Sequence, residues 1–329
     1  MKRRSVMLVV SLMFVVLGAL ASEAAVYKMK IHSVGSDMHA STFALKDFKK
    51  YVEEKSKGQI QVSLHINASL GGDRQATEAM QLGTLEAGII GGSILATFEP
   101  KFNIFEFPFL FKDDPTAKKL IDGELGTMLD KELQKQDLRV IAYGVNGFRH
   151  VANNRGPIRK PADMKGLKIR TMENPIHIAT FKLFGANPTP INFGELYTAL
   201  SQKTVDAMEC PVNLIYTSKF YEVQKYLSMT GHLYAIAPFV VSEIFFKRLP
   251  ADLQEILLDG GRRYRDKQRS LTVEEEQDML AKLKKSGMQV NDVSSSEKAE
   301  FKKLSAPVYK EFEGRVGKDL LEKVIAANK

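Results

Sequence analysis

The stretch of sequence that decides the fold lies between residues 161 and 211. Its two blocks are "PADMKGLKIRTMENP" (161–175) and "GANPTPINFGELYTALSQKTVDAMECP" (185–211). In the first block a short strand is predicted over 167–171. It is followed by Asn174-Pro175, a pair typical of a helix start because proline fits the first helical turn. A strand followed at once by a helix indicates an α/β unit.

The second block repeats this order. Asn192 precedes Glu195 by three residues, the spacing of an N-terminal helix cap, and an apolar face follows. A short strand is predicted over 205–208. Cys210-Pro211 then predicts another helix, with Cys210 at its N-cap.

The same alternation extends over most of the chain. Before the two blocks, strands are predicted over 27–31, 60–66, 85–90, 138–145 and 150–153, and helices over 41–55 and 73–82. Past Pro250 the chain is helical and charged almost to its end. We therefore expect an α/β protein with a parallel or mixed sheet. Because no linker separates two α/β lobes, the chain should cross between them more than once and leave a ligand cleft at the hinge.

The first 24 residues have the order of a secretory signal peptide. Basic residues 2–4 precede an apolar run over 6–20, and small residues follow up to Ala25, with a cleavage site after Ala24. The alternative is a membrane anchor, but the run is short for a span of roughly 20 apolar residues. We expect the mature protein to be free in the periplasm.

Composition narrows the function classes. Cleavage after Ala24 would remove three basic residues and one acidic residue, which lowers the net charge from +8 to +6. No basic block with interleaved aromatic residues is present, so no nucleic-acid partner is expected. The six histidines lack metal-ligand spacing and the single cysteine allows no intramolecular disulfide, so neither metal nor cofactor is predicted. No catalytic motif is found, and we predict that the protein is not an enzyme.

Cys210 has two interpretations. At a helix N-cap the helix dipole would lower the pKa of its thiol, which suits a nucleophile, but no general base is identifiable. The same position suits contact with an anion, since free N–H groups point there. Anion contact is preferred, and a periplasmic enzyme using Cys210 remains an alternative.

Two arginines are candidate carboxylate ligands. Arg170 ends the predicted strand 167–170, and Arg149 lies in a predicted turn over 146–149. A guanidinium group forms a planar, two-pronged pair with a carboxylate, and a strand end holds it rigidly.

The blocks quoted above resemble the solute-binding subunit of tripartite ATP-independent periplasmic (TRAP) transporters, the DctP family. The resemblance also covers "SLGGDRQATEAMQLGTLEAG" (69–88), "KFYEVQKYLSMTGH" (219–232) and the helical tail, which together span nearly all of the mature chain. It implies a two-lobed, type II-like periplasmic binding protein with a long C-terminal helix spanning both lobes. Lobe I would comprise 25–146 plus about 236–275, and lobe II 147–235 plus about 276–329.

The resemblance also implies site roles. Arg170 matches the main carboxylate-binding arginine, Arg149 a second one, and Phe193 a residue that packs on the ligand. Cys210 departs from the family pattern Asp-Gly-x-Glu-Asn-Pro, in which a ligand-binding asparagine takes its place. Ser33 and Gly92 match pocket positions more loosely.

The implied function is capture of a small organic acid by lobe closure and its delivery to the small and large permease subunits. A membrane sensor kinase is a further candidate partner. A receptor of an ATP-driven importer is the alternative within the same class. A dicarboxylate, sugar acid, 2-oxo acid or aromatic acid would each satisfy two arginines, and the cysteine at position 210 favours a less polar monocarboxylate.

Overall fold

The computed structural model describes residues 25–328, and the predicted signal peptide lies outside this range. Between these limits no helix is long and apolar enough to span a bilayer. The strands are β1 Tyr27–Ser33, β2 Ile60–His65, β3 Ala87–Ile89, β4 Leu138–Asn153, β5 Lys168–Thr171, β6 Asn187–Pro190, β7 Ala207–Pro211, β8 Tyr226–Ser242 and β9 Gln289–Asp292.

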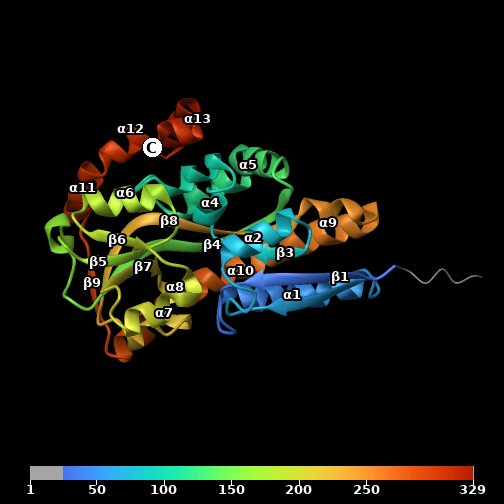
Figure 1. The fold of residues 1–329 in the computed structure, drawn as a ribbon, viewed down its shortest axis with the longest axis horizontal. Coiled ribbons are helices and arrows are strands. Elements are labelled where there is room, and N and C mark those ends of the chain that lie inside the picture. The colour runs from blue at the N-terminus through green and yellow to red at the C-terminus, as the bar shows by residue number, and fades with distance from the viewer. Residues whose placement is uncertain (1–24, 329) are drawn as a thin grey trace, which may run out of the picture.

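Helices alternate with these strands up to β8 and dominate after it (Figure 1). The α-helices are α1 Ala40–Lys55, α2 Asp73–Gln81, α3 Gly92–Leu95, α4 Asp114–Asp122, α5 Glu124–Gln134, α6 Pro175–Leu183, α7 Phe193–Ser201, α8 Val212–Thr217, α9 Glu243–Arg248, α10 Ala251–Lys285, α11 Ser295–Leu304, α12 Ala306–Val316 and α13 Lys318–Ala327. Short 3₁₀ helices are η1 Pro100–Glu106, η2 Pro161–Met164 and η3 Phe220–Glu222.

Within the described chain the strands form one mixed sheet of nine, in the order β2-β1-β3-β8-β4-β7-β5-β6, with β9 beside β8. The long strands β4 and β8 pair along their whole length. The C-terminal end of β8 pairs with β3, whereas its N-terminal end pairs with β9. The end of β4 pairs with β7. Two smaller sheets are thus joined through one central two-stranded ribbon (Figure 1), which confirms the predicted two-lobed α/β fold.

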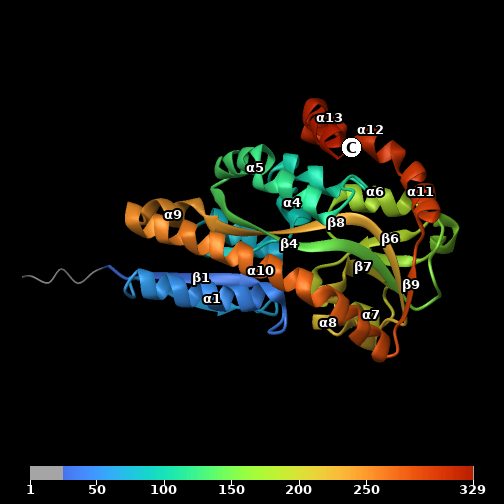
Figure 2. The same ribbon diagram turned by 180° about the vertical axis from the view of Figure 1, so that it is seen from behind.

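Helix α10 is the second link between the halves. Its 35 residues extend for about 52 Å at 1.5 Å per residue. It packs against α1 and β4 at one end and α8 at the other (Figure 2). The predicted long helix spanning both lobes is therefore present. Because the halves share β4, β8 and α10, bending at these elements can move one half relative to the other.

The hydrophobic core is divided in the same way. One cluster packs α1 and α10 on the first half of the sheet around Phe48, Phe239 and Tyr264. A second lies beneath α4, α5 and α12. Two smaller clusters fill the other half, on either side of β5 and β7. The first cluster thus belongs to one half and the two smaller clusters to the other, whereas the second cluster joins α4 and α5 to α12.

Two predicted helix starts are confirmed and two local predictions are wrong. The side chains of Asn174 and Asn192 cap α6 and α7 by accepting from the backbone N–H groups of Ile176 and Gly194. The strands predicted over 138–145 and 150–153 are a single strand, β4. The predicted turn before Arg149 is instead an irregular part of that strand, with register shifts on either side of Gly147, whose φ is +85°.

Candidate functional site, a cavity between the two halves

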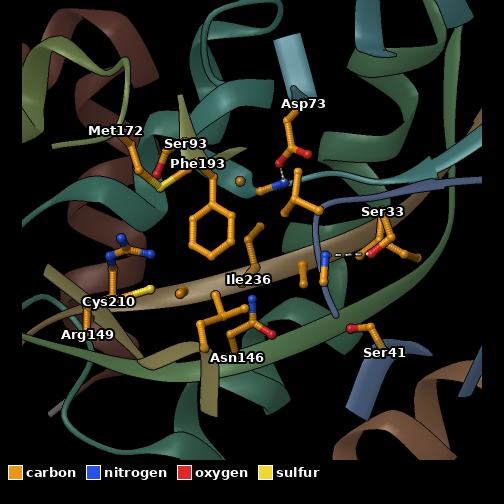
Figure 3. A pocket seen from close by; sticks show the side chains of 18 of the residues that line it. Ser33, Ser41, Asp73, Ser93, Asn146, Arg149, Met172, Phe193, Cys210 and Ile236 are labelled. Atoms are coloured by element: carbon orange, nitrogen blue, oxygen red, sulfur yellow. Dashed lines mark hydrogen bonds between the residues drawn. The ribbon is translucent and has the colours of Figure 1, made fainter. Parts of the chain in front are cut away.

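A cavity of about 70 Å³ lies at the middle of the β4–β8 ribbon, between the two halves of the sheet (Figure 3). On the scale of buried water sites this volume holds on the order of five water-sized groups. All six residues predicted from the sequence line it, namely Ser33, Gly92, Arg149, Arg170, Phe193 and Cys210. Its other walls are largely apolar, with contributions from Ile89, Met172, Leu214 and Ile236. The folding of distant segments thus brings the predicted residues to one place.

Arg170 is a buried cation without an ion-pair partner among the described residues. It lies on β5 and is only 2% exposed. Its Nε donates to the carbonyl oxygen of Ile191 at 2.8 Å, and neither Nη1 nor Nη2 hydrogen-bonds to any described residue. Burial lowers the pKa of Arg170 to about 10, so the group stays charged at neutral pH. A desolvated charge of this kind costs free energy unless a counter-ion pairs with it.

Arg149 lies on the same cavity but already has a counter-ion. Its Nε and Nη2 donate to the two carboxylate oxygens of Glu209, and Nη2 also donates to the Glu209 carbonyl oxygen at 2.9 Å. In the antiparallel register of β4 and β7, Val151 is opposite Glu209. Arg149 precedes Val151 by two residues on the same face of β4, so its side chain can reach Glu209 diagonally. Burial alone would lower the pKa of Arg149, but the charge of Glu209 outweighs it and the pKa is raised.

Glu209 is the centre of a buried polar cluster behind the cavity. Burial alone would raise its pKa, but the charge of Arg149 and a hydrogen bond from His232 lower it overall. His232 Nε2 lies 3.3 Å from Glu209 Oε2. On the other side, His177 Nδ1 lies 3.8 Å from Glu209 Oε1, and its Nε2 lies 2.5 Å from Glu106 Oε2. The cluster connects Glu209 of one half with Glu106 of the other.

The prediction that Cys210 is a helix N-cap is wrong. Cys210 is in β7, opposite His150, and Pro211 takes the N-cap position with extended backbone (φ −64°, ψ 152°). Burial raises the pKa of the Cys210 thiol to about 11, so the expected lowering by a helix dipole is also wrong. Proline fits an extended strand end as well as a first helical turn, which is why the pattern misled. Figure 3 shows the sulfur beside Arg149.

Ser33, Gly92 and Phe193 take different positions around the cavity. Ser33 ends β1, and its hydroxyl accepts from the N–H of Gly35 at 3.1 Å. Phe193 begins α7, and its ring lies under the guanidinium of Arg170 with 6.0 Å between centres. A Cβ atom at Gly92 would lie 2.5 Å from Ile236 Cγ1, so only glycine fits there without movement of Ile236.

Two contacts join the halves at residues close in sequence to the cavity lining. Arg74 of α2 donates to Glu173 at 2.6 Å, and the Ser36 hydroxyl donates to the Thr217 carbonyl oxygen at 3.0 Å. Both bonds join the first half of the sheet to the second. The structure therefore has its two halves in contact.

Three acidic residues in or beside the cavity were not singled out from the sequence. Glu209 lies inside the quoted block, but its pairing with Arg149 depends on strand register, which the sequence does not reveal. Glu106 had a usable signal, because it is the one charged residue in the apolar run "FNIFEFPFLF" (102–111). A charge inside such a run is expected to be buried and paired. Asp73, whose carboxylate accepts from the N–H of Gly91, also lines the cavity.

Comparison with known proteins identifies the family. The family model described as "Bacterial extracellular solute-binding protein, family 7" (DctP) matches residues 31–315. The chain belongs to this family. The resemblance to TRAP solute-binding proteins is thereby confirmed. The two-lobed fold and the cavity between the halves also fit a solute-binding protein.

Individual relatives agree with this family 7 assignment. A solute-binding protein of Verminephrobacter eiseniae is 38% identical and covers 93% of this chain and 91% of its own length. The 2,3-diketo-L-gulonate-binding periplasmic protein YiaO of Escherichia coli is 37% identical over 78% of each chain. The crystal structure of a TRAP periplasmic solute-binding protein from Polaromonas, bound to D-erythronate, superposes with a TM-score of 0.88. It is 34% identical and covers 91% of this chain and 98% of the other.

Proposed function

We propose that this family 7 protein captures a small organic acid in the periplasm and delivers it to the membrane subunits of a TRAP permease. The observation that carries the proposal is the guanidinium of Arg170, which is buried at the cavity and lacks an anionic partner among the described residues. A ligand carboxylate supplies that partner. The D-erythronate in the Polaromonas structure and the diketogulonate of the Escherichia coli relative are both carboxylates, which supports this ligand class.

The proposal gives each predicted cavity residue a role. Arg170 holds the carboxylate with Nη1 and Nη2, since its Nε is fixed by the Ile191 carbonyl. Arg149 adds a hydrogen bond from Nη1, which has no partner among the described residues, but little net charge because Glu209 offsets it. Phe193 packs on the ligand and on Arg170. Cys210, Ser33 and Gly92 complete the walls.

Lobe closure is the proposed means of capture. Lobe I comprises residues 25–146 plus about 236–275, and lobe II residues 147–235 plus about 276–329. These boundaries divide β4 and β8 at the cavity, close to the irregular pairing around Gly147. Arg170 and Arg149 then belong to lobe II, and Ser33 and Gly92 to lobe I. The Arg74–Glu173 ion pair joins the lobes when they are closed.

Binding rather than catalysis is proposed for the cavity. Cys210 is 1% exposed, its thiol pKa is raised to about 11, and no hydrogen bond links its sulfur to another described residue. A thiol in this state is a poor nucleophile. In the described part of the chain no group of three or more His, Cys, Asp or Glu residues is placed to hold a metal ion.

The proposed location and partners follow from export. Cleavage after Ala24 would release the mature protein, beginning near Ala25, into the periplasm, where it meets the small and large permease subunits. Presentation of the loaded form to a sensor kinase is a second use of the same closed state. N-terminal sequencing of periplasmic protein tests the cleavage, and an uncleaved chain in the membrane fraction would contradict it.

The test of ligand class is a thermal-shift screen of an organic-acid library. An acid that binds only the folded protein stabilises it by about 2.7 kcal/mol at a hundredfold excess over its Kd. We expect carboxylates to give the shifts and Arg170→Gln to abolish them. Arg159→Gln is the matched control, because it makes the same change at an exposed arginine. Shifts that persist in Arg170→Gln would overturn the proposal.

A further inference from the structure

The cavity contains a carboxylate whose hydrogen bonding is one-sided. Glu106 ends η1 and is 3% exposed. Its Oε2 accepts from the Ser93 hydroxyl at 2.6 Å and lies 2.5 Å from His177 Nε2. Its Oε1 hydrogen-bonds to none of the described residues, although each carboxylate oxygen can accept two donors. Glu106 therefore presents an acceptor that its own surroundings leave unused.

Gly92 keeps that oxygen uncovered. A Cβ atom at position 92 would lie 3.6 Å from Glu106 Oε1, so any longer side chain there would cover it. Ile236 Cγ1 lies 2.5 Å from the same Cβ position, so Ile236 and Glu106 both pack on this side of Gly92. Gly92 and Glu106 both line the cavity, and a donor in the cavity can thus reach Oε1.

The charges around the cavity favour a ligand with one carboxylate. Arg170 is the cation without an ion-pair partner among the described cavity residues, since Arg149 is paired with Glu209. Asp73, the second acidic residue of the lining, already has a contact to His32 at 3.1 Å and accepts from the Gly91 N–H at 2.9 Å. A second ligand carboxylate would be repelled by Glu106 without gaining a free cation.

We propose that the ligand is a short hydroxy monocarboxylate with an otherwise apolar body. Its carboxylate pairs with Arg170, and its hydroxyl group donates to Glu106 Oε1. Glu106 is then the specificity residue, because it rewards a hydroxyl group and rejects a second carboxylate. The apolar body packs on Phe193, Met172 and Ile236. This inference rests on the proposed acid-binding function and narrows it.

The first experiment uses four-carbon acids on the mature wild-type protein. Calorimetry would compare butyrate, succinate and the 2-, 3- and 4-hydroxybutyrates. These four-carbon acids differ in the presence and position of a hydroxyl group or in a second carboxylate. We expect at least one hydroxybutyrate to bind about tenfold or more tightly than butyrate, the range of a hydrogen bond to a charged group. Succinate should bind more weakly than that hydroxy acid. Tighter binding of succinate would overturn the inference.

The second experiment removes the charge of Glu106. Glu106→Gln should reduce the preference for the hydroxy acid over butyrate to less than threefold and should raise succinate affinity about tenfold. Glu78→Gln is the matched control, because it makes the same change at an exposed glutamate and should leave the hydroxy preference in place. An unchanged preference in Glu106→Gln would overturn the inference. Should Glu106→Gln fail to fold, the wild-type ranking still decides.

The two proposals fail in different ways. If no carboxylate binds the wild-type protein, the organic-acid function itself is wrong. If carboxylates bind through Arg170 but the hydroxy group brings no advantage over butyrate, only the role of Glu106 is wrong.

Discussion

The two arginines of the cavity carry the same charged group in opposite circumstances. Arg149 is 5% exposed and Arg170 is 2% exposed, so both have lost most of their hydration. Arg149 is paired with Glu209 through two nitrogens, and its pKa is raised. Within the described part of the chain Arg170 hydrogen-bonds only to a backbone carbonyl oxygen, and burial lowers its pKa to about 10. The difference lies in the counter-ion.

This difference separates stability from binding. An internal ion pair, once built, is costly to break, because the remaining partner is left buried and charged. An unpaired buried cation is already costly, and its removal relieves the folded state while taking away the site for an anion. Arg149 should therefore contribute mainly to folding and Arg170 mainly to the ligand.

The largest expected effect on stability is that of Arg149→Met. It leaves Glu209 buried without its cation, and breaking such a pair costs about 3–5 kcal/mol of unfolding free energy. Urea unfolding of the acid-free protein measures it. The double variant Arg149→Met/Glu209→Met should recover much of the loss, because no unpaired charge remains. A double variant as unstable as the single one would contradict the account.

The dependence of stability on acid pH should reveal the Arg149–Glu209 ion pair. The folded-state pKa of Glu209 is lowered by Arg149 despite burial. Its contribution to stability is therefore complete above the unfolded carboxyl pKa near 4.3 and is lost as the pH falls through the lower, folded pKa. Glu209→Gln should be less stable than wild type at pH 7, because it leaves Arg149 buried without its anion, and should lose less stability on further acidification below pH 4. Parallel stability curves for the two proteins would show that the pair does not matter.

The smallest expected effect concerns Cys210, which is close to both arginines. Burial raises the pKa of its thiol, and the charge of Glu209 partly cancels the lowering by Arg149. Iodoacetamide at pH 7.5 should therefore leave the folded protein unmodified over a period in which the urea-unfolded protein reacts fully. Rapid labelling of the folded protein would mean that Glu209 does not offset the charge of Arg149 as described.

Much of the fold was predictable because its signals are local. Asn174 and Asn192 precede helices with the right spacing, and their side chains are the caps. The strand order was not predictable, since β4 and β8 pair although about 70 residues of other structure separate them. For the same reason the turn predicted over 146–149 is wrong. Gly147 suggests that a strand ends there, but it marks an irregularity within the continuous strand β4.

The sequence indicated residues that line one cavity, but not the partners that they have there. Arg170 and Arg149 were chosen because a guanidinium matches a carboxylate, and both line the cavity. The counter-ion of Arg149 could not be predicted, because Glu209 becomes its partner only through strand pairing. Cys210-Pro211 fits a helix start or a strand end equally well, and tertiary structure decides between the two.

The most direct test of this account is the unfolding free energy of Arg170→Met, measured in urea with and without a saturating acid that stabilises the wild type. Without acid, the variant should be at least as stable as the wild type, because a desolvated cation has been removed. With acid it should gain nothing, whereas the wild type gains about 2.7 kcal/mol at a hundredfold excess over Kd. An acid-free variant destabilised as strongly as Arg149→Met, yet still stabilised by the acid, would contradict the central claim.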